Sequence, residues 1–147
     1  MLQERCSGVL SEVLKAAPDP RVLAWLKGQS LSSLFTTTVT RGEVLYGIRL
    51  LSDGTRRPGL WDAALAIFNE DFDGRVLSFD ADAAAAFAEI GAARRAAGKP
   101  IRQFDAMIGG MARSRGASIA TRNMRDFDDC GIGVVDPWAV WGGLGLG

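Results

Sequence analysis

The chain has 147 residues, of which 48% are hydrophobic and 23% are charged, and its formal net charge at pH 7 is zero. This length and apolar content predict one globular domain whose core needs no disulfide support. Two cysteines are too few for a disulfide scaffold, and the sequence shows neither a signal peptide nor an apolar run long enough to span a bilayer. We therefore expect a cytosolic protein that makes no use of a membrane.

The first half of the chain is expected to be mainly helical. Asp19 followed by Pro20 is the signature of an N-cap with proline in the first helical turn. Thr40 is expected to cap the helix that follows the first apolar, β-branched run. The predicted elements are helices over residues 9–16, 20–27 and 41–51, a strand over 34–38, and a polar loop over 52–58.

The second half alternates helices with short apolar strands, which is typical of a parallel sheet covered by helices. Asp80 is expected to cap an alanine-rich helix, and Gly116 to close the next one. The predicted helices cover 59–71, 82–97 and 103–115, and the predicted strands cover 76–79, 118–120 and 133–135. The fold class is thus α/β with a central parallel β-sheet flanked by helices, in one domain over 1–140 followed by a glycine-rich tail over 141–147.

Basic residues are concentrated between residues 94 and 125, where eight lysines and arginines surround a single acid, Asp105. Such a segment suits a polyanion such as a phosphate backbone, although solvated helix faces would have the same composition. The candidates for phosphate contacts are Arg102, Arg113, Arg122 and Arg125.

Glu43 lies within an apolar arc of the predicted 41–51 helix, together with Val44, Tyr46, Leu50 and Leu51. One interpretation is a capping box, in which Glu43 bonds back to the amide of Thr40. The other is a metal ligand, because the start of this helix faces the end of the preceding strand.

Asp105 falls at the edge of an apolar stripe on the predicted 103–115 helix, with Gly109 leaving an open surface one turn further along. The stripe consists of Phe104, Met107, Ile108 and Met111. Asp105 could be a first-turn aspartate favoured by the helix dipole, or a partly buried carboxylate that a bulky anion approaches.

Three polar residues, Thr121, Asn123 and Asp126, follow the predicted strand 118–120. Ligands of open parallel sheets bind beyond the carboxyl ends of the strands, although Asn123 and Asp126 could equally cap a short turn. The sequence contains no histidine, so hydrolysis would depend on carboxylates. Oxygen ligands indicate a hard cation, Mg²⁺ or Mn²⁺, and with the nearby arginines they predict phosphodiester hydrolysis.

Several segments together resemble the PIN-domain ribonucleases, specifically the VapC-type toxins of bacterial toxin-antitoxin pairs. The likeness is carried by Val-Leu-Ser-Glu at 9–12, Asp-Pro-Arg-Val at 19–22, residues 40–48 and 101–115, Thr-Arg-Asn at 121–123 with Asp126-Phe127, and Asp-Pro-Trp at 136–138. It implies a Mg²⁺-dependent endoribonuclease that forms a homodimer and is blocked by a cognate antitoxin. It also implies that Glu43 and Asp105 are metal-site acids, that Asn123 or Asp126 is a fourth ligand, and that Thr121 is a supporting hydroxyl. The apolar helix faces at 22–26 and 44–51 are candidates for the dimer surface.

The chain departs from the family pattern before Val9. The family has an apolar strand that ends in Asp-Thr-Asn, whereas here Cys6 stands at the position of the leading metal-binding aspartate. A thiol is a soft donor and a poor ligand for Mg²⁺, so the resemblance implies either a weakened ribonuclease or an inactive homologue that binds an antitoxin in a regulatory complex. Gln3, Glu4 and Arg5 are also unsuited to a strand buried on both faces, and a displaced start of the coding sequence would explain the same departure.

Overall fold

The computed structural model describes residues 2–3, 8–51 and 56–139. Its α-helices are α1 (Gly8–Val13), α2 (Pro20–Lys27), α3 (Thr38–Arg49), α4 (Arg56–Ala66), α5 (Ala81–Ala96) and α6 (Gln103–Ser114). Shorter helical segments are η1 (Leu31–Ser33), the π-helical η2 (Ile67–Asp71) that continues α4, and η3 (Met124–Phe127). The strands are β1 (Leu2–Gln3), β2 (Thr36–Thr37), β3 (Val76–Leu77), β4 (Ile119–Ala120) and β5 (Val134–Val135).

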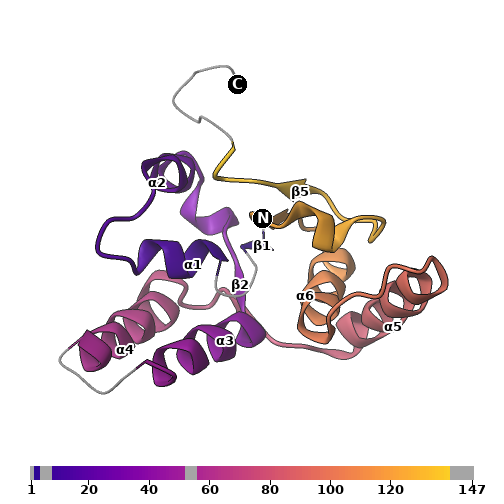
Figure 1. The fold of residues 1–147 in the computed structure, drawn as a ribbon, viewed down its shortest axis with the longest axis horizontal. Coiled ribbons are helices and arrows are strands. Elements are labelled where there is room, and N and C mark those ends of the chain that lie inside the picture. The colour runs from indigo at the N-terminus through magenta and orange to yellow at the C-terminus, as the bar shows by residue number, and fades with distance from the viewer. Residues whose placement is uncertain (1, 4–7, 52–55, 140–147) are drawn as a thin grey trace.

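All of the strand pairs within these residues are parallel, as the alternation of elements predicted. The strands form two separate ladders rather than one continuous sheet, in the orders β1-β4-β5 and β2-β3. Leu2 pairs with Ile119 and Ile119 with Val134, while Thr36 pairs with Val76. Helices α1, α2 and α4 lie on one side of the strands and α5 and α6 on the other (Figure 1).

Local capping chemistry sets most helix starts where the sequence predicts them. The side chain of Asp19 accepts a hydrogen bond from the Arg21 amide, and that of Asp80 accepts one from the Ala83 amide at 2.9 Å. The prediction that Thr40 caps α3 is wrong. Thr37 is the N-cap, and its Oγ1 accepts the Thr40 amide at 3.0 Å, so the helix begins one turn earlier than expected.

Other boundaries differ by a few residues. Helix α1 ends at Val13 rather than near residue 16, and α4 begins at Arg56, within the stretch predicted to be a loop. Proline is compatible with the first turn of a helix, so Pro58 does not delay the start of α4. Residues 52–55 of that predicted loop and the glycine-rich tail at 141–147 lie outside the described residues. No helix in the described part of the chain is long and apolar enough to cross a membrane.

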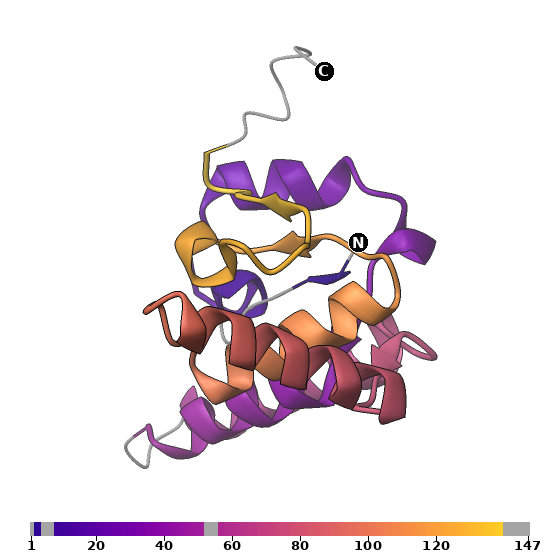
Figure 2. The same cartoon turned by 90° about the vertical axis from the view of Figure 1, so that its right-hand side faces the viewer.

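The buried apolar side chains form two clusters. One gathers the inner faces of α1 to α4 around Val22, Trp25 and Phe68. The other joins α5 and α6 to β4 and η3 around Ile108, Met111 and Phe127. In Figure 2, the side of the molecule formed by α5 and α6 faces the viewer, and the two helices lie side by side. Because α6 packs along α5, this pair of helices sets the position of Asp105, the acid in the first turn of α6.

Candidate active site

Asp105 is almost completely buried, with 1% of its surface exposed. It lies in the first turn of α6, and the buried face of that helix also includes Ile108, Gly109 and Ala112. Spacings of three and four residues place these positions on one side of a helix. The face that packs is therefore rotated from the predicted apolar stripe, because Phe104 is 49% exposed while Asp105 is enclosed.

The open surface expected at Gly109 is wrong. A β-carbon at Gly109 would lie 3.4 Å from Ile132, 3.5 Å from Ile90 and 3.8 Å from Phe127, which is ordinary packing contact. Gly109 therefore belongs to the core between α6, α5 and η3, and whatever approaches Asp105 does so from another direction.

Glu43 lies in the second turn of α3 and is half-buried, with its Oε1 shielded from solvent. Since Thr37 caps the helix, Glu43 is six residues beyond the cap and the capping box with Thr40 is wrong. Glu43 is one of the residues that line a cavity of about 240 Å³ between α1, α3 and α4, together with Lys15 and the apolar Ile48 and Leu60. Capping therefore does not account for an acid at this position.

The polar segment after β4 forms a compact turn. Thr121 is 1% exposed, and its Oγ1 accepts a hydrogen bond from the Asn123 amide at 3.1 Å. Asn123 precedes η3 without a side-chain capping bond, and its carbonyl accepts the Asp126 amide at 3.1 Å. The cap expected from Asn123 is thus not formed, whereas Thr121 fixes the backbone that carries Asn123.

The four candidate phosphate-binding arginines differ in their surroundings. Arg102 and Arg125 are exposed, and Arg102 stands at the N-cap position of α6 without capping it. Arg113 donates to Glu89 at 3.1 Å and is eight residues beyond Asp105, roughly 12 Å along the helix axis. The guanidinium of Arg122 lies 5.0 Å from the ring centre of Trp138. Arg102 and Arg122 are thus close in sequence to candidate ligands, while Arg113 is engaged near the other end of α6.

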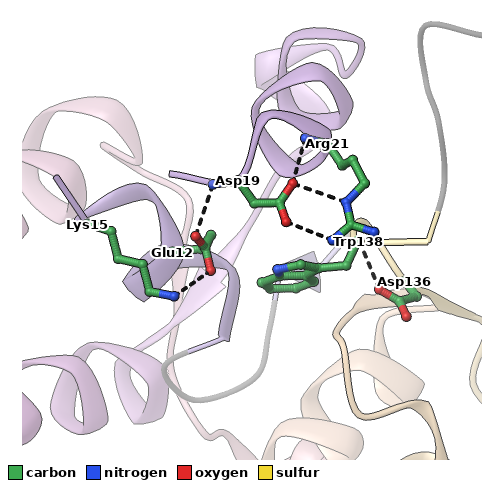
Figure 3. A network of polar contacts seen from close by, with 6 residues as sticks. All are labelled: Glu12, Lys15, Asp19, Arg21, Asp136 and Trp138. Atoms are coloured by element: carbon green, nitrogen blue, oxygen red, sulfur yellow. Dashed lines mark hydrogen bonds and ion pairs between the residues drawn. The ribbon is translucent and has the colours of Figure 1, made fainter. Parts of the chain in front are cut away.

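A polar network joins α1 to the start of α2 (Figure 3). Glu12 is 6% exposed; it accepts Lys15 Nζ at 2.9 Å and the Asp19 amide at 3.0 Å. Burial raises the pKa of Glu12, but the hydrogen bonds from Lys15 and from the Asp19 amide outweigh it and lower the pKa overall. Hydrogen bonds from the Arg21 side chain and amide lower the pKa of Asp19 to about 2.

The same network reaches the end of the described chain. The Trp138 amide donates to Asp136 Oδ1 at 2.8 Å, and the charge of Asp136 helps to raise the pKa of Arg21, after the larger effect of its hydrogen bond to Asp19. Trp138, 5% exposed, in turn holds Arg122 through its ring face. These contacts hold Arg122, in the turn after β4, against Trp138 near the end of the described chain, a connection between distant segments that sequence spacing did not indicate.

The helices that carry the candidate acids contact one another, because α3 touches α6 and α6 touches η3. Among residues 2–3, 8–51 and 56–139, however, no group of three acids and cysteines is close enough to hold a metal ion. Glu43, Asp105 and Asp126 are thus not gathered into one preformed cluster there. Cys6 and Glu4, the residues at and near the family's leading aspartate, lie outside the described residues.

The donor chemistry nevertheless fits a hard cation. Asp105 Oδ2 and Glu43 Oε1 are carboxylate oxygens shielded from solvent, and Mg²⁺ is commonly held by one or two carboxylates with waters and substrate phosphate completing its shell. Fold and site together define an α/β domain of short parallel strands with enclosed acids on adjoining helices. The chain belongs to the PIN-domain family, whose model matches residues 7–132.

Known proteins agree with this assignment over most of the chain. The chain is 36% identical to the plasmid stability protein StbB of Pseudomonas syringae pv. tomato, over 90% of this chain and 95% of that protein. It is 33% identical to the VapC ribonuclease Y4jK of Sinorhizobium fredii, over 90% of this chain and 94% of the relative. A solved structure of FitAB bound to a DNA fragment has a chain that superposes with a TM-score of 0.87 at 30% identity, covering 95% of this chain and 97% of that one. The predicted PIN-like fold and the likeness to VapC-type proteins are confirmed.

Proposed function

We propose that the chain is a metal-dependent endoribonuclease toxin of a type II toxin-antitoxin pair. The observation that carries this proposal is the enclosed carboxylate of Asp105, 1% exposed in the first turn of α6. Carboxylate oxygens are the ligands that Mg²⁺ and Mn²⁺ prefer in proteins. Among the relatives of this chain is a protein named as a VapC ribonuclease.

Asp105 and Glu43 would hold the ion, Mg²⁺ or Mn²⁺, and the segment after β4 would bring Asp126 and Asn123 to it as further oxygen donors when the ion binds. When bound, such an ion activates water and offsets the charge that develops on the phosphoryl group. Thr121 orients Asn123 through the hydrogen bond to its amide. The enclosure of Asp105 keeps its carboxylate away from bulk water, which strengthens its interaction with a cation.

The arginines would hold the RNA backbone. Arg102 and Arg125 are exposed, and Arg122 is oriented by Trp138. Guanidinium groups bind phosphate through paired hydrogen bonds, so these three side chains are suited to position a strand at the acids. Arg113 is the least suited of the four, because it already pairs with Glu89.

The test is RNA cleavage by the purified chain, freed of any antitoxin, in buffer with Mg²⁺. We expect cleavage that disappears on chelation and in Asp105→Asn. The matched control is Asp82→Asn, since Asp82 is also an aspartate in the first turn of its helix, α5, but is exposed. If wild type and Asp105→Asn cleave equally, or neither cleaves, the enzyme proposal is wrong.

A second candidate function is an inactive PIN protein that acts only by binding an antitoxin. It is motivated by Cys6, which stands where the family has a metal-binding aspartate. Calorimetry distinguishes the two, because this candidate requires that the wild type binds no Mg²⁺ while Cys6→Asp does. Clear Mg²⁺ binding by the wild type would exclude it.

Assembly with an antitoxin in the cytosol is part of the proposal. Chains similar to this one occur in solved structures of FitAB and of VapBC. Of the faces expected to form a homodimer, Val22 and Val44 are buried in the core of the single chain, whereas Tyr46 on α3 and its C-cap Leu50 are 66% and 67% exposed. We expect Tyr46→Asp with Leu50→Glu to halve the mass measured by light scattering, and an unchanged mass would remove α3 from the dimer surface.

A further inference from the structure

Arg94 belongs to the basic segment over residues 94–125, but its guanidinium points into the protein. It lies in the last turn of α5 and is 7% exposed. Its Nε donates to the Lys99 carbonyl at 2.7 Å, and its Nη1 donates to the carbonyls of Asp126 at 3.0 Å and Asp128 at 2.9 Å. The Arg94 side chain thus connects the end of α5 to the last residues of η3 and to Asp128, the residue that follows η3.

These bonds fall on a turn that enters the left-handed region twice. Asp129 has φ of 58°, which aspartate and asparagine adopt more often than most residues other than glycine, and Gly131 has φ of 72°. The Cys130 thiol donates to the Asp128 carbonyl at 3.5 Å and lies 3.8 Å from Arg94 Nη1. A turn of this kind persists where its surroundings hold it, and Arg94 supplies two of the bonds that do so.

Helix α5 also sets the position of Asp105. It packs along α6, and a β-carbon at Gly110 of α6 would come within 2.6 Å of the Ala83 carbonyl oxygen. The backbones of α5 and α6 are therefore in close contact, which fixes α6. The same helix holds Asp105 through this packing and Asp126 through Arg94.

We propose that Arg94 is a positioning residue for the candidate metal site, which places Asp126 and Asn123 relative to Asp105 by binding the backbone of η3. The inference rests on the proposed function, because it gives Asp126 the role of a ligand. Arg94 itself contacts neither metal nor RNA. It acts by binding the backbone carbonyl of Asp126, whose side-chain carboxylate is the proposed metal ligand.

The geometry requires an arginine. Its fork of five N–H donors can serve several carbonyls from one fixed plane, whereas a lysine has three donors on one flexible nitrogen. Arg94→Lys keeps the charge and most of the apolar stem but loses that fork. Residues that orient the ligands of a metal without contacting the metal typically change its affinity by about 10 to 100-fold when they are replaced.

The experiment measures Mn²⁺ affinity by calorimetry in the full chain, without RNA, for wild type, Arg94→Lys and Asp126→Asn. We expect Arg94→Lys to weaken binding by about tenfold or more. In RNA cleavage, the Mn²⁺ concentration for half-maximal rate should rise, while the rate at saturating Mn²⁺ recovers most of its wild-type value. Circular dichroism establishes that the variant is folded, and Arg94→Gln, which keeps a planar donor group, is the second variant if Arg94→Lys does not fold.

Arg115→Lys is the matched control. Arg115 is also an arginine that connects α6 to α5, through Asp80 at 2.9 Å, but it binds an exposed carboxylate and not η3. Its Mn²⁺ affinity should equal that of the wild type. If Arg94→Lys binds Mn²⁺ as tightly as the wild type while Asp126→Asn binds it more weakly, this inference is wrong and the proposed function is unaffected. Absence of Mn²⁺ binding in both the wild type and Cys6→Asp would overturn the metal-dependent function and the inference with it.

Discussion

Gly110 faces the Ala83 carbonyl so closely that a β-carbon at residue 110 would lie 2.6 Å from that oxygen and 2.8 Å from the Phe87 amide nitrogen. Both neighbours are backbone atoms of α5 and cannot rotate away. We expect Gly110→Ala to lower the free energy of unfolding by about 1–3 kcal/mol, because the two helices must move apart. Urea unfolding followed by circular dichroism measures the change.

Gly91→Ala is the control for that substitution. Gly91 lies within α5, and a β-carbon there meets no atom within 4 Å. Alanine is a better helix former than glycine, so Gly91→Ala should raise the free energy of unfolding by about 0.5–1 kcal/mol. Equal effects at residues 110 and 91 would mean that α5 and α6 are not in close backbone contact.

Thr37 ends β2 and caps α3, so one side chain serves both elements. It is completely buried, and its Oγ1 accepts the Thr40 amide and donates to Thr40 Oγ1 at 3.1 Å. Thr37→Val keeps the shape but leaves that buried amide without its acceptor, at an expected cost of about 1–2 kcal/mol in thermal or urea unfolding. Thr37→Ser keeps the hydroxyl and should recover most of this loss, and no difference between the two variants would contradict Thr37 as the cap.

Acid should destabilise the fold through Asp19. Hydrogen bonds from Arg21 lower the pKa of Asp19 from 3.8 to about 2 in the folded chain, so folding favours the ionised form. This contribution is complete above pH 3.8 and is lost as the pH falls from about 4 toward 2. The melting temperature should therefore fall in that window, and fall less steeply in Asp19→Asn.

The pH series has its own control in Asp82→Asn, a change at an exposed position of α5. Its melting temperatures should fall in parallel with those of the wild type. If Asp19→Asn also follows the wild type throughout, the bonds between Asp19 and Arg21 do not contribute to stability.

Metal binding should be visible in stability, independently of cleavage. A ligand that binds only the folded state stabilises it by about 2.7 kcal/mol at 100 times its dissociation constant. We therefore expect Mn²⁺ to raise the melting temperature of the wild type and EDTA to reverse the rise. In Asp105→Asn the rise should be absent, and a rise of equal size would show that the ion binds elsewhere.

The types of most elements after residue 8 followed from the sequence because the signals are local, whereas β1 at Leu2–Gln3 was not predicted. Asp19-Pro20, Asp80 and Gly116 mark helix ends through bonds and φ values within a few residues, and each lies where it was expected. Among the predicted caps, the exception was Thr40 at the start of α3. Thr37 and Thr40 are both acceptable caps in sequence, and the pairing of Thr37 with Leu77 in β3 places it at the boundary.

The candidate acids were proposed from the sequence, where each also had a structural alternative as a cap or as a first-turn acid. Their surroundings did not follow from the sequence. Periodicity placed Phe104 inside and Asp105 at an edge, whereas the packed face of α6 is set by the close approach of α5 at Gly110. Arg94 appeared to be one more basic residue, and its three carbonyl partners lie five to 34 positions away in the chain.

The sequence by itself determined the family, the types of most elements after residue 8 and the residues proposed to bind a cation, because these depend on local propensity and residue chemistry. Only the tertiary structure decided which of those residues are enclosed, which arginines remain exposed, and how the turn after β4 is held. Those properties arise where distant segments meet, at Arg94 on η3 and at Trp138 against Arg122. A contact between residues far apart in the chain leaves no periodic signal in either segment.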